Sequence, residues 1–307
     1  MVNGHPHQGD EGGLSTGDRV FPLLRLPPSF LRSLDNPPDP PVRPRPSATL
    51  VLLRQAGFGL EVLLLKRSPR SGFIPGAWVF PGGTVDRDDA DPGILSRIHG
   101  VTQEAANERL RPSVSEPPAL AYWVAALRET FEETGILLHR GTGKVRDSGH
   151  PSASGETPAD SEAHREAEGF ARSRLLAGEA SFREILETLD LTLDAGALEY
   201  NGHWLTPECE HRRYETRFFA AEVQWDAQVT PHERELVEAH WLSPAEALTR
   251  NRDGTLPLVF PTIFTLEELE PFRSPGEALG YLRGKPVPRR LPELQRTEGG
   301  ISIRLTD

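Results

Sequence analysis

The sequence predicts an α/β fold in which short strands and amphipathic helices pack in layers. Two apolar runs at 48–53 and 61–65 flank a glycine-containing turn at 57–59, a pattern typical of a hairpin of buried strands. A helical pattern over 119–134 follows, and short strands and a closing helix come after it. This order of elements predicts an α/β sandwich for residues 47–270.

The segments before this helix differ sharply in composition. Residues 1–46 are rich in Gly, Pro and Asp, which predicts an extended and partly disordered N-terminal arm. A third short strand at 78–80 leads into a glycine turn. The segment 90–118 has the character of an insertion, and Thr102 is placed to cap a helix within it.

The 119–134 helix is expected to end at Gly135, because glycine readily adopts the left-handed conformation of a helix C-cap. The second insertion, 140–168, has almost no apolar periodicity and predicts a disordered excursion. Later patterns predict a helix at 182–189, strands at 203–205, 214–221 and 240–242, and a helix starting at 243–248. Residues 271–307 form a C-terminal extension.

Composition excludes several classes of protein. The formal charge of −11 argues against a nucleic-acid-binding surface, which requires a basic stripe. The sequence contains no run of eighteen apolar residues, so we expect no membrane span. No secretory signal is visible at the N-terminus. Cys209 is the one cysteine, so an intrachain disulfide is excluded. We expect a cytoplasmic protein; the sequence predicts no oligomeric state.

The run 128–136 carries the strongest chemical signal. Glu129, Glu132 and Glu133 stand at i, i+3 and i+4, on one face of a helix and within about one turn of each other. Three ionised carboxylates at that spacing repel one another unless a cation lies among them, so the pattern indicates a hard-metal site. The turn at 80–83 is able to bring backbone oxygens to the same ion.

Together these two segments resemble the Nudix hydrolase motif, G-x5-E-x7-R-E-U-x-E-E-x-G-U, where U is a bulky aliphatic residue. The resemblance implies an α/β/α sandwich with a mixed central sheet and metal-dependent cleavage of a diphosphate bond. It also implies that Glu129 and Glu133 are the leading ligands of Mg²⁺ or Mn²⁺, with Glu132 a third and the Gly83 carbonyl a fourth. Arg128 would then orient a glutamate by a charge-assisted hydrogen bond.

The chain departs from this motif in three ways. Asp89 stands where the family has its first glutamate, and Thr130 replaces an aliphatic residue. The segment between Asp89 and Arg128 has 38 residues where the motif has seven, so 31 extra residues split the Nudix box. A split at this point resembles the coenzyme A diphosphatases, a branch that contains peroxisomal animal enzymes and bacterial relatives. The final tripeptide, 305–307, is not a peroxisomal address.

Two residues compete for the role of general base. Glu129 is one, because family members differ in which glutamate takes the proton. Glu235, in the acidic loop 231–238, is the other. His232 and His240 have weaker claims, since a lone histidine more often has a structural role.

Substrate choice depends on a second resemblance. Residues 63–83 are similar to the coenzyme A motif L-L-T-x-R-[SA]-x3-R-x3-G-x3-F-P-G-G, with Leu65 for Thr and Gly72 for the second Arg. Arg67, Arg70 and Gly76 are therefore the predicted substrate-binding residues, with Arg70 as the substitute for the missing arginine. The guanidinium groups would recognise the 3′-phosphate of coenzyme A.

The resemblance predicts a small-molecule substrate of the coenzyme A class, which would be cleaved to 3′,5′-ADP and a phosphopantetheine product. Two alternatives stay open. One is hydrolysis of ADP-ribose, a dinucleotide or another nucleoside-diphosphate substrate. The other is a catalytically silent Nudix module that binds a ligand.

The two insertions carry different expectations. Deletion of much of 140–168 should cost little stability, because few apolar side chains are available to bury. The first insertion has Ile94, Leu95, Ile98 and Leu110, which we expect to dock beside the site. Shortening it should therefore alter substrate affinity more than thermal stability.

Overall fold

The computed structural model describes residues 19–21, 28–57, 59–72, 74–141, 158–232, 236–298 and 300–306. The strands are β1 Arg19–Phe21, β2 Arg45–Ala56, β3 Gly59–Arg67, β4 Trp78–Val79, β5 Gly82–Thr84, β6 Ile98–His99, β7 His139–Gly141, β8 Leu191–Asp194, β9 Glu199–Leu205, β10 Tyr214–Glu222, β11 Leu236–Leu242, β12 Arg289–Thr297 and β13 Gly300–Thr306. The helices are α1 Pro28–Asp35, α2 Pro92–Leu95, α3 Gln103–Leu110, α4 Ala119–Thr134, α5 Pro158–Leu176, α6 Phe182–Thr188, α7 Pro244–Arg252, α8 Phe260–Leu269 and α9 Pro275–Leu282, with 3-10 turns at Arg87–Ala90 and Ala195–Ala197.

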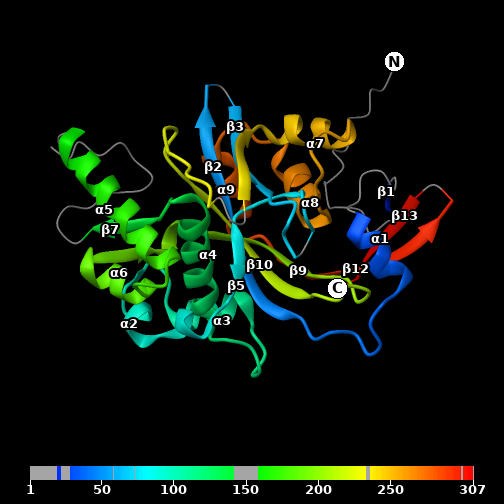
Figure 1. Cartoon of the computed structure of the whole chain (residues 1–307), viewed down its shortest axis with the longest axis horizontal. Helices are drawn as coiled ribbons and strands as arrows, with labels where there is room; N and C mark the ends of the chain where they lie inside the picture. Colours follow the sequence, from blue (N-terminus) through cyan, green and yellow to red (C-terminus); the bar gives the residue numbers. More distant parts are fainter. Residues whose placement is uncertain are drawn as a thin grey trace, which may run out of the picture.

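The main sheet is mixed and has the strand order β1-β13-β12-β9-β10-β2-β3-β11. Strand β10 runs parallel to β2, and β12 runs parallel to β9, whereas the other neighbours along this order are antiparallel. Two short strands join at the side, β4 on β3 and β5 on β2. A second, smaller sheet of β6, β8 and β7 lies beyond α4 (Figure 1).

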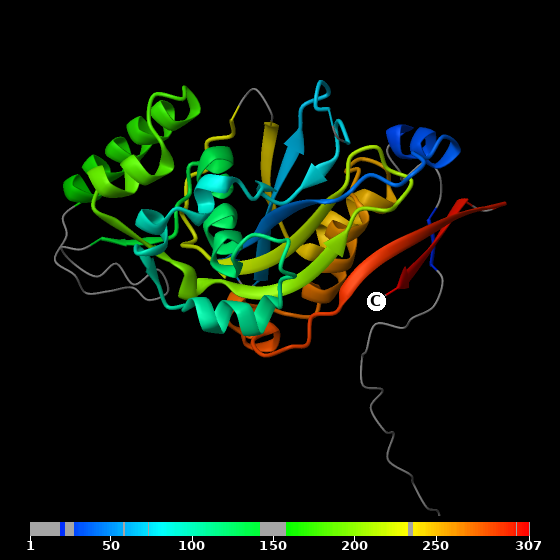
Figure 2. The same ribbon diagram turned by 90° about the horizontal axis from the view of Figure 1, so that it is seen from below.

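Helices cover both faces of the main sheet, as the two views in Figures 1 and 2 show. Side chains along β2 alternate between the faces: Leu50 and Leu52 pack in the hydrophobic cluster of α4, whereas Val51 and Leu53 pack in the cluster of α7, α8 and α9. This alternation is the period-2 pattern of a strand buried on both sides. The predicted α/β/α sandwich with a mixed sheet is confirmed.

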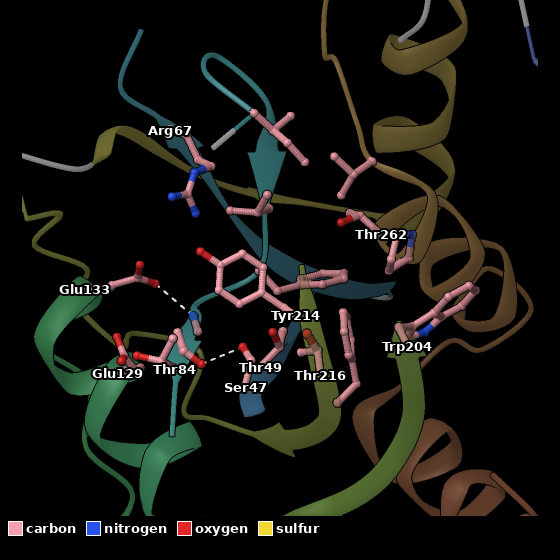
Figure 3. A pocket seen from close by; sticks show the side chains of 18 of the residues that line it. Ser47, Thr49, Arg67, Thr84, Glu129, Glu133, Trp204, Tyr214, Thr216 and Thr262 are labelled. Carbon is pink, nitrogen blue, oxygen red and sulfur yellow. Dashed lines mark hydrogen bonds between the residues drawn. The ribbon is translucent and has the colours of Figure 1, made fainter. Parts of the chain in front are cut away.

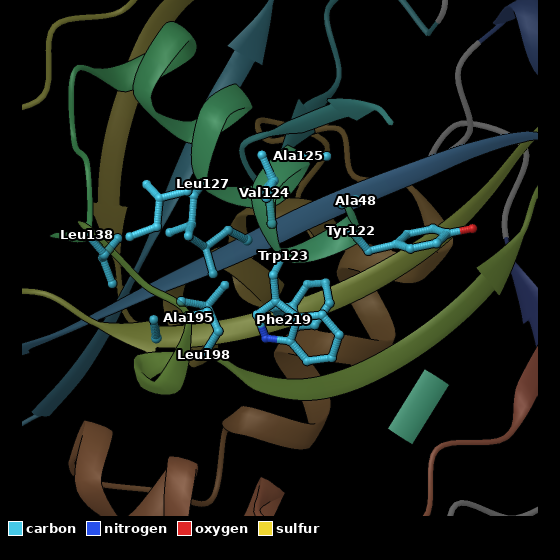
Figure 4. Close-up of a cluster of buried hydrophobic side chains, with 14 of the residues drawn as sticks. Ala48, Tyr122, Trp123, Val124, Ala125, Leu127, Leu138, Ala195, Leu198 and Phe219 are labelled. Carbon is cyan, nitrogen blue, oxygen red and sulfur yellow. The ribbon is translucent and has the colours of Figure 1, made fainter. Parts of the chain in front are cut away.

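Helix α4 is the centre of one layer. Fourteen of its sixteen residues are buried, and Figure 4 shows several of them packed over β2 and β10. The helix ends where the sequence predicts, because Gly135 has φ 81° and donates its N–H to the carbonyl of Phe131 at 2.9 Å. The predicted cap of α3 is also present, since the Thr102 hydroxyl accepts from the N–H of Ala105 at 3.2 Å.

Glycine is required where β5 lies against β2. A Cβ on Gly82 would stand 2.7 Å from the Cα of Thr49, closer than real Cβ atoms approach a backbone. The absence of a side chain lets the strand pair tightly, with Gly83 opposite Ala48. This pairing brings the glycine turn to the end of α4 that carries the glutamates.

The expectation of a disordered second insertion is wrong for residues 158–168. They form the first part of helix α5, whereas residues 142–157 lie outside the described part of the chain. Local composition gives little reason for a helix here, because the stabilising contacts come from elsewhere. His139 of β7, for example, lies 2.8 Å from the Glu168 carboxylate of α5.

The first insertion contributes to the core rather than to the site. Ile94 and Leu110 are 2% and 5% exposed and belong to the cluster under α4. Leu95 and Ile98 pack against the same cluster, and none of the four side chains lines the pocket described below. The expected docking of these side chains beside the site is wrong, so we now expect shortening of this insertion to cost stability.

Described segments near both chain ends belong to the fold, which the composition does not indicate. Within the predicted extended arm 1–46, β1 pairs with β13 and Pro28–Asp35 forms helix α1. Arg296 of β12 binds the Asp35 carboxylate, with both distances from Nη2 at 2.7 Å. The partners of these segments lie at the opposite end of the chain, where local patterns give no sign of them.

Within the described residues, no helix has the length and apolar character to cross a membrane.

Candidate active site

A pocket of about 570 Å³ opens between the end of α4 and the face of the sheet that carries α8. One end is formed by the carboxylates of Glu129, Glu132 and Glu133 together with the glycine turn. The opposite end is aromatic and apolar, with Trp204 and Phe260 buried in its wall. Figure 3 shows Glu129 and Glu133 on one side, Trp204 on the other and Tyr214 between them.

Arg128 joins the two halves of the split Nudix box. Its Nε and Nη2 donate to the two carboxylate oxygens of Asp89 at 2.7 and 2.9 Å, and Nη2 also donates to the carbonyl of Thr84 at 3.0 Å. Asp89 is fully buried and Arg128 is 8% exposed. A bidentate pair of this kind fixes a guanidinium in position as well as neutralising it. The 31-residue insertion therefore leaves the loop half and the helix half in contact.

The same guanidinium also holds two of the glutamates. Its Nη1 lies 3.0 Å from Oε1 of Glu129 and 3.1 Å from Oε1 of Glu132. Glu133 is held separately, because its Oε2 accepts the N–H of Gly82 at 2.9 Å. The structure therefore brings the three carboxylates predicted as metal ligands to one end of the pocket, beside Gly83.

Burial dominates the electrostatics of this end. It raises the pKa of Glu129 to about 7, and the opposing attraction of Arg128 is smaller. It also raises the pKa of Asp89 above its ordinary value, although Arg128 again opposes the change. Burial by itself would lower the pKa of Arg128, but its hydrogen bond to Asp89 and the nearby glutamates raise it, so the guanidinium stays charged.

The donors at this end match a hard divalent cation in type. They are carboxylate oxygens and the Gly83 carbonyl, which accepts from the Ser47 hydroxyl at 2.6 Å and has a second lone pair. Within the described ranges, however, no three acidic, His or Cys side chains form a ready-made cation site. The contacts explain this, because Arg128 holds Glu129 and Glu132 while Gly82 holds Glu133. Arg128 contacts Oε1 of Glu129 and of Glu132, so the second oxygens of these two carboxylates would be the ones to hold an ion.

The predicted substrate residues fall in different places. Arg67 lines the pocket and donates from Nε and Nη2 to the Ser71 hydroxyl at 3.2 and 3.1 Å. Arg70 is exposed and is not among the residues that line the pocket. Gly76 has φ 76° and serves a turn, away from the pocket wall. The structure thus places one of the two arginines in a position to contact a ligand.

The candidate general bases are only partly described. Glu129 is in the pocket, whereas Glu235 lies outside the described residues. His232, three residues earlier in the sequence, lines the pocket and donates its main-chain N–H to the carbonyl of Glu133 at 3.1 Å. His240 packs on the ring of Trp78, with 4.7 Å between the ring centroids, and does not line the pocket.

Sequence reasoning missed two parts of the site. The aromatic end, with Trp204, Tyr214 and Phe260, comes from segments far apart in the chain, and only the fold brings them together. Leu175 and Leu176, at the end of α5, also line the pocket. Their segment follows an insertion whose composition indicates disorder, so no local signal marks them.

Comparison with known proteins agrees with the geometry. A family model described as the NUDT19 Nudix domain matches residues 40–269. The human acyl-coenzyme A diphosphatase NUDT19 is 29% identical over 289 residues, which cover 85% of this chain and 72% of the human protein. The Gallus gallus protein of the same name is 30% identical over 236 residues, and this alignment spans 70% of the chain but 62% of that relative's length.

One solved structure is similar in both sequence and fold. It is the crystal structure of a Nudix hydrolase from Alicyclobacillus acidocaldarius, which is 30% identical with a TM-score of 0.61. The match covers 78% of this chain and 96% of the bacterial one. The common fold therefore extends over nearly the whole of that enzyme.

Proposed function

Because the chain belongs to the NUDT19 Nudix domain family and is a Nudix pyrophosphohydrolase, we propose a substrate for it. We infer that it cleaves the diphosphate bond of coenzyme A or acyl-coenzyme A. Water would add across one phosphorus–oxygen bond of the diphosphate bridge. The products would be 3′,5′-ADP and phosphopantetheine or its acyl derivative, with release of protons. Mg²⁺ or Mn²⁺ is the proposed cofactor.

One observation carries the proposal of a catalytic site. Arg128 contacts Asp89 from the loop half of the Nudix box and Glu129 and Glu132 from the helix half. A binding module without catalysis has no need to gather a fully buried Asp89 and two partly buried glutamates around one guanidinium, because burying charge is costly unless the charges are paired. The arrangement supports an active enzyme in spite of the Asp89 substitution.

Each group at this end has a proposed task. Glu129, Glu132 and Glu133 would hold the divalent ion with the Gly83 carbonyl. When bound, such an ion neutralises the charge of the diphosphate and activates water towards attack. Arg128 holds Glu129 and Glu132 at this end of the pocket, and the N–H of Gly82 holds Glu133.

Glu129 is the proposed acceptor of the proton from the attacking water. Its carboxylate lies in the pocket beside the glycine turn, at the end where the ion and the attacking water would be held. In the protein without metal, burial raises the pKa of this carboxyl to about 7. Glu235 is the alternative, and Glu235→Gln compared with Glu129→Gln distinguishes the two.

The proposed substrate class rests on the polarity of the pocket. Arg67 lines the pocket, on the same side as Glu133 in the view of Figure 3, and would provide a cation for the 3′-phosphate. The far end is lined by the aromatic side chains of Trp204, Phe218 and Phe260, which carry no charge. An uncharged pantetheine arm, with or without an acyl chain, suits such a surface.

We expect Arg67→Ala to reduce kcat/KM for coenzyme A by roughly tenfold to a hundredfold, because a hydrogen bond to a charged group contributes about 1.5–3 kcal/mol. Removing the 3′-phosphate from the substrate should cause a similar loss in the unaltered enzyme. The two losses should not add, because each removes one partner of the same contact. Steady-state kinetics of both proteins with coenzyme A and dephospho-coenzyme A measures all four values.

Arg70→Ala is the matched control, because this arginine is exposed and does not line the pocket. It should leave the kinetics with both substrates near those of the unaltered enzyme. Equal cleavage of coenzyme A and dephospho-coenzyme A by the unaltered enzyme would remove the support for coenzyme A. Hydrolysis of ADP-ribose or a dinucleotide would then be the better proposal.

A further inference from the structure

Helix α5 contacts α4 at the turn that carries Glu132 and Glu133. Arg172 is the residue at this contact, and its Nε and Nη2 donate to the main-chain carbonyl of Glu132 at 3.1 and 2.7 Å. The side chain is 7% exposed, so the guanidinium has left solvent to make these bonds. Three and four residues further along the same helix, Leu175 and Leu176 reach the pocket wall.

The contact completes the hydrogen bonding of the end of α4. The last four carbonyls of a helix have no partners within the helix and must find them elsewhere. The carbonyl of Phe131 accepts from Gly135, that of Glu133 from the N–H of His232, and that of Thr134 from the N–H of Thr230. Arg172 donates to the remaining carbonyl, that of Glu132. Among these four donors it is the charged side chain.

A charged donor at this place is more than an ordinary cap. The end of a helix carries a partial negative charge, and here three glutamate side chains increase it. A buried cation beside that end opposes the repulsion among the carboxylates and fixes the turn with two bonds at once. Arg172 also lies against the end of the helix, since a Cβ on Gly135 would be in ordinary van der Waals contact with its Nη1 at 3.4 Å.

We propose that Arg172 is a positioning residue for the cation site, which makes the segment after the Nudix box part of the active site. It holds the main chain of Glu132, and through this turn it sets where the carboxylates of Glu132 and Glu133 point. The inference depends on the metal site of the proposed function but not on the identity of the substrate. Residues around a metal site that orient its ligands typically affect affinity or activity by about 10- to 100-fold.

The test uses the full-length protein with Arg172→Met, which removes both donors while keeping most of the apolar stem. The helix should stay docked, because His139 still binds Glu168 and Leu175 still packs against the core. Mn²⁺ binding to the substrate-free protein is measured by calorimetry. The values of kcat and KM for coenzyme A are measured in a separate assay. We expect Mn²⁺ affinity and kcat each to fall by about tenfold or more, with a smaller change in KM.

Arg172→Lys should recover part of both values, because it restores the charge and one donor. Arg165→Met is the matched control, since this arginine is exposed on the same helix, and it should change neither. A folded Arg172→Met protein with unaltered Mn²⁺ affinity and kcat would overturn the proposal. Should that variant fail to fold, Arg172→Gln carries the test, because it also removes the charge, and unaltered Mn²⁺ affinity and kcat in a folded Arg172→Gln protein would overturn the proposal.

Failure of the substrate assignment gives a different result. If the unaltered protein binds Mn²⁺ but leaves coenzyme A intact, the proposed substrate falls. The role of Arg172 is then judged by the Mn²⁺ affinities of the variants alone. If the unaltered protein binds no Mn²⁺, both the metal site and the role of Arg172 are wrong.

Discussion

Glu133→Gln, and separately Glu129→Gln, should reduce turnover by about a hundredfold to a thousandfold or more, the scale seen when one preorganised electrostatic group is removed from an active site. The substitution removes a charge from a proposed metal ligand but keeps its size and one carbonyl oxygen. In Glu133→Gln that oxygen can still accept from the N–H of Gly82, so packing and folding should hardly change. The measurement is kcat at saturating Mg²⁺, with the unfolding midpoint in urea as the check on folding.

Glu108→Gln is the control for these variants. Glu108 is exposed on α3 and does not line the pocket, so the same chemical change there should leave turnover unaltered. A folded Glu133→Gln or Glu129→Gln enzyme with a rate near that of the unaltered protein would show that the carboxylate is not part of the site.

Arg128→Met should lower the free energy of unfolding by about 3–5 kcal/mol, because it leaves a buried carboxylate without its partner. Asp89 would bear the whole of this loss, because it is fully buried and both of its carboxylate oxygens bind Arg128. Turnover should also fall, because Glu129 and Glu132 lose the group that holds them. Urea denaturation gives the stability and steady-state kinetics gives the rate.

The double variant Arg128→Met with Asp89→Asn should recover part of the stability, because no unpaired charge then stays buried. Arg183→Met provides the comparison on the surface. Arg183 also binds two carboxylates, those of Asp91 and Glu187, but its side chain is 48% exposed. Its removal should cost much less stability than the loss of Arg128, because solvent screens an exposed ion pair. Stability losses at positions 128 and 89 that simply add would contradict a coupled buried pair.

The helix that carries the glutamates was predictable from the sequence because its signals are local. An apolar stripe, carboxylates on the other face and Gly135 as the stop together define α4 within sixteen residues. The hairpin of β2 and β3 was predictable for the same reason, from two apolar runs around a short turn. In these segments, local preference and tertiary packing favour the same structure.

The parts that escaped prediction depend on contacts between distant residues. Helix α5 has a polar composition, and one of its contacts with α4 is the bond from Arg172 to Glu132, forty residues apart in the chain. Strand β13 pairs with β1, which lies near the other end of the sequence. Most of helical stability in proteins comes from such packing rather than from propensity, so composition alone underestimates it.

Asp89 illustrates a different limit. The motif predicts glutamate at this position, and the shorter side chain counts as a defect when only the pattern is considered. The structure shows that aspartate reaches Arg128 with both oxygens, because the 3-10 turn Arg87–Ala90 brings its main chain close to α4. Because the main chain lies closer to Arg128, the shorter side chain is long enough to reach it.

Mass spectrometry of the products formed from coenzyme A is the most direct test of the proposed activity. The purified protein is incubated with coenzyme A or an acyl-coenzyme A, with Mg²⁺, with Mn²⁺ and with a chelator, and Glu133→Gln serves as the inactive control. We expect 3′,5′-ADP and phosphopantetheine, or its acyl form, in equal amounts and only when metal is present. Intact coenzyme A under every condition, together with cleavage of ADP-ribose or a dinucleotide in the same assay, would contradict the coenzyme A diphosphatase activity.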